Sequence, residues 1–243
     1  MALKKNEAAA TKPRRRRDPD GTRMAILEAA GTLLAKDGPE GLSVSQVAQL
    51  AGVNRGTAYQ HFQTREQLVD ATTVWVSEQL CEAVFGGLAP RSPVEHIDPQ
   101  HVSEHMVQFA MQNPELGRAW LFHVLSSPHP ANDPFWKQYR QRFQKFAKSE
   151  SAQPGIDIDV HTVLMIIGTF LWPVWARAHT RTAKDRQLMA TRFSDEILRL
   201  SLYGNMRPEK YPALAAKLSK KAPKKTPPKA PKKVAAGTSR RSK

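Results

Sequence analysis

The 243-residue sequence contains a single cysteine, and this scarcity bears on where the protein folds. Cys81 has no second cysteine with which to form an internal disulfide, so we expect a protein of the reducing cytoplasm. The N-terminal residues also lack the basic segment followed by an apolar segment that is typical of a secretory signal. Both absences predict a cytoplasmic protein.

Long apolar runs and catalytic patterns are missing too. The longest apolar run, Val163 to Ala176, is shorter than the roughly 20 residues that span a bilayer. We therefore interpret it as a buried helix and expect no membrane partner. The sequence contains no paired acid–base motif, no glycine-rich phosphate loop and no nucleophile setting around Cys81, so we predict no enzymatic activity and no cofactor.

Histidines are the only metal-ligand type that clusters. His101 and His105 are four residues apart, which places both imidazoles on one face of a helix. No cysteine or HExxH pattern accompanies them, so we interpret the two side chains as polar pocket or surface groups and predict no metal site.

Acidic residues are scarce at both ends of the chain. The net charge of +15 divides into +5 for residues 1–23, +12 for residues 207–243 and −2 for the residues between them. Such a distribution predicts two flexible basic segments on a near-neutral body, and a polyanion as the partner.

The stretch from Leu42 to Leu68 has the strongest local signals in the sequence. Ser43, Asn54 and Thr64 are predicted to cap three successive helices, which begin at residues 44, 55 and 65. Gly52 provides the tight turn between the first two. Two short helices joined by such a turn form a helix-turn-helix, whose second helix lies in the DNA major groove.

The run AQLAGVNRGTAYQHFQTREQL within this stretch resembles the signature of the tetracycline-repressor-like (TetR) family of bacterial transcription regulators. The resemblance covers residues 22–80. It implies an all-α protein with an N-terminal three-helix head that binds DNA and a helical body that binds an effector. It also implies base-edge or groove contacts for one set of residues, namely Ser45, Arg55, Gly56, Thr57 and Gln60, and phosphate contacts for another, namely Ser43, Tyr59, His61 and Arg65.

The side-chain chemistry supports several of these roles. Arg55 is able to pair with guanine O6 and N7, and Gln60 with adenine, while the Tyr59 hydroxyl suits a phosphate. The alternative is that Tyr59, His61 and Phe62 merely pack helix against helix, and for Phe62 we favour packing. The preceding basic arm is expected to follow phosphates or enter a minor groove through Arg14, Arg15, Arg16 and Arg17, the alternative being a solubilising terminus.

The body is expected to contain an effector pocket and a dimer contact. Large apolar side chains recur at helical spacing after residue 100, and most should form the core. Those we select as effector contacts are Met106, Phe109, Trp120 and Trp172. The last two predicted helices, residues 157–178 and 183–203, are expected from the resemblance to form a homodimer, so that a near-palindromic operator is read by two heads.

The C-terminal segment is rich in lysine, alanine and proline and resembles the tails of linker histones. We predict four parts: a disordered arm (1–21), the DNA-binding head (22–66), the ligand-binding and dimerisation body (67–206) and a disordered tail (207–243). The favoured function is a homodimeric, nucleoid-associated transcriptional repressor that a small apolar or aromatic effector releases from DNA. The alternative is an architectural DNA-binding protein dominated by its basic tails.

Overall fold

A computed structural model describes residues 18–86 and 99–221 of the chain. Its regular structure is helical throughout these ranges, which confirms the predicted all-α class. The order is α1 (Pro19–Asp37), η1 (Pro39–Gly41), α2 (Val44–Leu50), α3 (Arg55–His61), α4 (Arg65–Phe85), α5 (Pro99–Gln112), α6 (Pro114–Ser126), η3 (Pro130–Asn132), α7 (Pro134–Ala147), α8 (Ile158–Ala178), α9 (Ala183–Gly204), η4 (Pro208–Lys210) and α10 (Pro212–Lys221).

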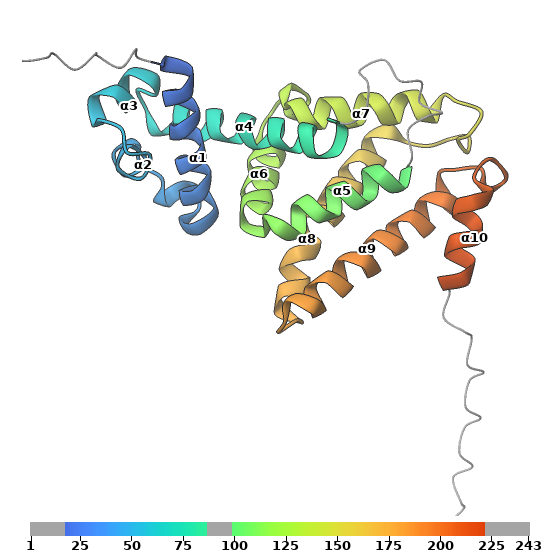
Figure 1. Ribbon diagram of the computed structural model, residues 1–243. Helices are drawn as coiled ribbons and strands as arrows, with labels where there is room; N and C mark the ends of the chain where they lie inside the picture. Colours follow the sequence, from blue (N-terminus) through green and yellow to red (C-terminus); the bar gives the residue numbers. More distant parts are fainter. Residues whose placement is uncertain (1–17, 87–98, 222–243) are drawn as a thin grey trace, which may run out of the picture.

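The head consists of α1, α2 and α3 grouped at one end of the molecule (Figure 1). Helix α1 begins earlier than the predicted residue 22, because the Asp18 carboxylate accepts a hydrogen bond from the Gly21 backbone N–H and caps the helix. A buried apolar cluster that includes Ile26, Val47 and Phe62 holds the three helices together. Leu50, the last residue of α2, is 53% exposed and does not belong to this cluster.

Helix α4 runs from the head into the body (Figure 1). Leu68, near its start, is fully buried in the head cluster, and Phe85, at its end, is buried in the body core. These two residues lie about 25 Å apart along a helix that rises 1.5 Å per residue. One continuous helix therefore belongs to both cores.

The core of the body contains a buried polar network beside its aromatic side chains. The Asp133 carboxylate accepts hydrogen bonds from the Ser77 hydroxyl (2.8 Å), the Trp136 backbone N–H (2.9 Å) and the Trp120 indole N–H (3.1 Å). Because the Asp133 carboxylate accepts three hydrogen bonds, the network fixes α4, α6 and α7 against one another with each of these buried donors satisfied.

Helix α8 is more exposed than the sequence indicated. It is 21 residues long, and by length and composition alone it is apolar enough to cross a membrane, but only 28% of its most apolar window is buried. The interpretation of the 163–176 run as a buried helix is therefore wrong for the single chain. The exposed apolar side chains follow one face of α8, namely Val160, Leu164, Leu171, Val174 and Trp175.

The C-terminal segment also differs from the prediction. Residues 207–221, which we assigned to a disordered tail, contain η4 and α10. They are held because Leu218, with Leu214 and Tyr211 beside it, packs against Leu198 and Leu202 of α9. The disorder predicted for residues 1–17 and 222–243 lies outside the described residues and stays a prediction.

Candidate DNA-binding face and body pocket

The second helix of the helix-turn-helix, α3, has one exposed face and one buried face. Asn54 caps α3 through a 2.8 Å hydrogen bond from the Gly56 N–H, and Gly52 makes the preceding turn with a φ of 66°. Ala58 and Phe62, four residues apart, are buried against the head. The opposite face of α3 is therefore the part of the head that is free to meet a partner.

Four of the nine head residues predicted to contact DNA lie on that face. Arg55, Gly56 and Gln60 are exposed, and Tyr59 is 46% exposed. Thr57 and His61 are half-buried at its edges, and Phe62 packs in the core, as we favoured. Positions 55, 56, 59 and 60 share one helical face because the α-helix repeats every 3.6 residues.

Two of the remaining predicted contacts, Ser43 and Arg65, already make hydrogen bonds within the head. The Ser43 hydroxyl accepts a hydrogen bond from the Gln46 N–H and donates one to the Gln46 side chain, so it caps α2. Arg65 donates from Nε and Nη2 to the Pro39 carbonyl and pairs with Glu40 at 2.9 Å. Ser45 is half-buried on α2, and Arg14, Arg15, Arg16 and Arg17 lie outside the described residues.

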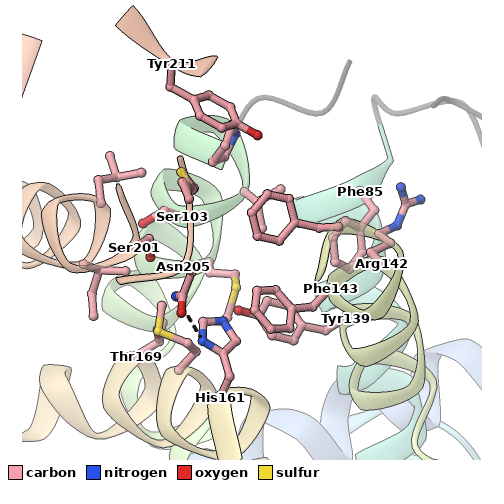
Figure 2. A pocket seen from close by; sticks show the side chains of 18 residues that line it. Phe85, Ser103, Tyr139, Arg142, Phe143, His161, Thr169, Ser201, Asn205 and Tyr211 are labelled. Carbon is pink, nitrogen blue, oxygen red and sulfur yellow. Dashed lines mark hydrogen bonds between the residues drawn. The ribbon is translucent and has the colours of Figure 1, made fainter. Parts of the chain in front are cut away.

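The body contains a cavity of about 120 Å³ between α4, α5, α7, α8 and α9. Figure 2 shows Phe85, Tyr139, Arg142 and Phe143 on one side of this cavity and Ser103, Ser201 and Asn205 on the other. Met206 and Tyr211, which follow α9, complete the lining. We call this cavity the body pocket.

Only one of the four predicted effector contacts lines the body pocket. Met106 does so, but Phe109, Trp120 and Trp172 are not among its lining residues. Trp120 is fully buried in the body core, and its indole N–H donates to Asp133. Trp172 donates to the Met189 carbonyl and stacks on Phe193, so it joins α8 to α9. Helical spacing identified these large side chains but not which of them face a hollow.

The segment after α9 is fastened beside the body pocket. Ala152, in the loop before α8, forms an antiparallel bridge with Met206, and Arg207 Nε donates to the Ala152 carbonyl at 3.0 Å. This bridge brings Met206 and Tyr211 against the pocket. Sequence reasoning missed both residues, since a lysine- and proline-rich composition hides the short apolar pattern of Tyr211, Leu214 and Leu218.

The titratable groups of the body are tuned by burial. Desolvation lowers the pKa of His161 to about 4, so its imidazole is neutral at physiological pH. Its Nδ1 lies 3.2 Å from the Asn205 amide, the contact drawn as a dashed line in Figure 2. Burial also raises the pKa of the Cys81 thiol to about 11, which disfavours the thiolate that a nucleophile requires.

His101 and His105 contact each other, and no third metal-ligating side chain joins them among the described residues. The rings of His101 and His105 stack with centroids 3.9 Å apart, and His105 Nδ1 lies 2.8 Å from the His101 carbonyl. Within residues 18–86 and 99–221 no group of three or more His, Cys, Asp or Glu side chains gathers. The absence of a resident metal remains an expectation from the sequence.

A helix-turn-helix head with an exposed second helix, mounted on a helical body that holds a pocket, defines the architecture of this protein. Residues 26–72 match the family described as bacterial regulatory proteins, tetR family. The chain is 33% identical over 90 residues to the HTH-type transcriptional repressor Rv3405c of Mycobacterium tuberculosis. It is 31% identical over 83 residues to the HTH-type transcriptional regulator CymR of Pseudomonas putida.

These matches leave most of the chain unmatched. They cover 36% and 34% of this chain, and the chain spans less than half the length of either relative, 47% and 41%. The likeness in sequence therefore rests on about a third of the chain.

Solved structures extend the likeness to the rest of the fold. A gamma-butyrolactone receptor, described as an ArpA-like protein, superposes with a TM-score of 0.56 at 21% identity, over 84% of this chain and 98% of that one. AibR, solved in complex with isovaleryl coenzyme A and operator DNA, gives a TM-score of 0.54 at 20% identity, over 72% of this chain and 97% of that one. At these identities the superpositions establish the fold alone.

Proposed function

We propose that this protein is a sequence-specific DNA-binding transcription regulator that acts as a repressor. The observation that carries the proposal is the exposed face of α3, where Arg55, Tyr59 and Gln60 stand opposite the buried Ala58 and Phe62. Guanidinium and carboxamide groups on a helix of this size are the donors and acceptors that read base edges in a major groove. The relatives are transcription regulators, which supports this role and a protein that is not an enzyme.

Charge in the head favours selectivity over general attraction. Residues 22–66 contain four Lys/Arg and four Asp/Glu, so the head carries no net charge. Sequence-independent attraction to phosphates depends on accumulated cations, and these are concentrated in residues 1–17 and 207–243. The head accordingly reads bases, while the basic termini supply affinity.

A homodimer through α8 and α9 follows from their exposed apolar faces. Beside the α8 residues given above, Leu188, Leu200 and Tyr203 of α9 are each more than half exposed. A second copy of the chain is the occupant that satisfies such a surface on both subunits at once through a two-fold axis. Two heads related by that axis require a near-palindromic operator.

The body pocket is the proposed effector site, and α4 is the proposed link to the head. Phe85 forms part of the pocket wall, and Leu68 of the same helix belongs to the head cluster. An effector that binds one position of α4 better than another changes the spacing of the two heads and so releases DNA.

One observation favours a second function. Residues 207–243 hold 13 Lys/Arg against one acidic residue, a composition that binds DNA of any sequence. If these residues dominate binding, the protein is architectural and the head contributes only a mild preference.

Selection of binding sites from random duplex DNA tests the proposal. The wild-type protein should enrich a near-palindromic sequence, and Arg55→Ala combined with Tyr59→Ala should lower affinity for that sequence about 100-fold, since each lost contact costs 1–3 kcal/mol. Lys36→Ala removes an exposed head cation outside α3 and serves as the control. Unchanged selectivity in the double variant would overturn the proposal.

A further inference from the structure

Among the described residues, the body pocket carries one permanent charge, and that charge has no anionic partner. Arg142 of α7 lies in the pocket wall with its Cζ 4.7 Å from the centroid of the Phe85 ring. Its Nε is buried and makes no hydrogen bond, and within residues 18–86 and 99–221 its guanidinium forms no ion pair. Arg142 as a whole is half-buried, but a buried donor without an acceptor is costly, so its Nε calls for an acceptor, and an anion also matches the charge of the guanidinium.

The described residues of the pocket wall supply no such anion. None of the 18 lining residues is an aspartate or a glutamate. Ser103, on the opposite side from Arg142 in Figure 2, also has a buried hydroxyl without a hydrogen-bond partner. His161 adds no second positive charge, because burial lowers its pKa to about 4.

The size and lining of the body pocket limit the size and chemistry of the molecule that carries the anionic group. A volume of about 120 Å³ is close to that of the apolar cavity of about 150 Å³ that accommodates benzene. The rings of Phe143 and His161 are stacked in parallel, 3.6 Å between centroids and 9° between planes, and Met106 and Met165 complete an apolar surface. A ring or a short branched hydrocarbon fits such a surface.

We infer that the body pocket binds a compact apolar monocarboxylate, with the carboxylate against Arg142 and the hydrocarbon part toward Phe143, Met106 and Met165. The planar guanidinium matches a carboxylate in geometry and in charge. This inference rests on the proposed function insofar as it makes the occupant an effector, and it narrows the effector from any apolar molecule to a small acid.

Titration calorimetry of the full-length protein tests the inference directly. The probes are benzoate, phenylacetate and cyclohexanecarboxylate, each paired with its primary amide, which keeps the shape and removes the charge. We expect at least one acid to bind about 10-fold or more tightly than its amide, since hydrogen bonds to charged groups are the strong ones. Arg142→Gln should abolish this preference, and Arg142→Lys should retain part of it.

Lys145→Gln provides the matched control, because Lys145 is an exposed cation on the same helix and does not line the body pocket. It should leave the preference unchanged. Thermal melts of each variant establish that the fold persists. The inference is overturned if every acid binds no better than its amide, if no acid binds at about 10 mM, or if Arg142→Gln preserves the preference.

A separate DNA-release assay distinguishes this inference from the proposed function. An acid that binds through Arg142 but leaves DNA affinity unchanged supports the pocket assignment and contradicts the effector role. Loss of site selection with intact acid binding contradicts the DNA-binding proposal alone.

Discussion

The exposed face of α3 and the body pocket differ in how their residues are brought together. The first is built within seven consecutive residues, between the cap at Asn54 and the buried Phe62. The second draws its lining from five helices and from the segment after α9. A surface made by one short helix depends on local capping and turn geometry, whereas a pocket made by many helices depends on the whole packed core.

The largest loss of stability that tests this contrast should come from a substitution in the buried polar network of the body. Asp133→Ala leaves the Ser77 hydroxyl, the Trp136 N–H and the Trp120 indole without their acceptor. We expect a loss of about 3 kcal/mol in the free energy of unfolding, measured by urea denaturation. Asp157→Ala, which removes an exposed cap of α8, should cost about 1 kcal/mol. Equal losses would mean that the network does not organise the body.

The next largest loss of stability at neutral pH should come from removing the segment after α9. A chain ending at Met206 loses the packing of Leu218 and Tyr211 on α9 and the hydrogen bond of Arg207 to Ala152. It should be about 2 kcal/mol less stable than the full-length protein, because burying one large apolar side chain contributes roughly that amount. A chain ending at Lys221 retains α10 and should match the full-length protein. If both truncations unfold alike, α10 contributes nothing to the body.

The dependence of folding stability on pH should distinguish the body pocket, which His161 lines, from the head. His161 has a folded-state pKa of about 4 against an ordinary value of 6.5, so the unfolded chain gains a proton first as the pH falls. Stability should therefore decline between pH 6.5 and 4, by an amount on the order of 2 to 3 kcal/mol. His161→Gln should lack this part of the decline, as measured by the denaturation midpoint. Identical pH profiles for both proteins would contradict the assigned burial.

The smallest expected loss of stability comes from a substitution in the head. Asn54→Ala removes the acceptor of the 2.8 Å hydrogen bond from Gly56 and should cost about 1 kcal/mol. Asn54→Ser restores an acceptor and should recover most of the loss. Circular dichroism melts of the three proteins provide the comparison, and a serine variant as unstable as the alanine variant would argue against capping.

The two regions also differ in how far they were predictable from sequence. The bounds of α2 and α3 and the start of α4 were predictable, because caps and tight turns are local signals. These signals come from Ser43, Gly52, Asn54 and Thr64. Helical periodicity located α8 and α9 equally well, but it did not indicate that α8 is exposed along one face. Periodicity reports that a face is apolar, and not what covers it.

The body pocket was the least predictable part. Of our four effector candidates only Met106 lines it, since Trp120 serves the Asp133 network and Trp172 the contact with α9. Arg142 and Tyr211 could not have been chosen from composition, because their position depends on how α7 and the segment after α9 meet α4 and α5. Tertiary packing decides which side chains of an amphipathic helix face a cavity.

The central claim is that α3 reads a defined operator and that the basic tail only adds affinity. Genome-wide selection of bound DNA fragments tests it most directly, using the full-length protein and a chain ending at Lys221, both at near-physiological salt. The account predicts that both proteins enrich the same near-palindromic site, with weaker salt dependence in the shorter chain because fewer phosphates are neutralised. Broad enrichment that vanishes when residues 222–243 are removed would contradict the account and establish an architectural DNA-binding protein.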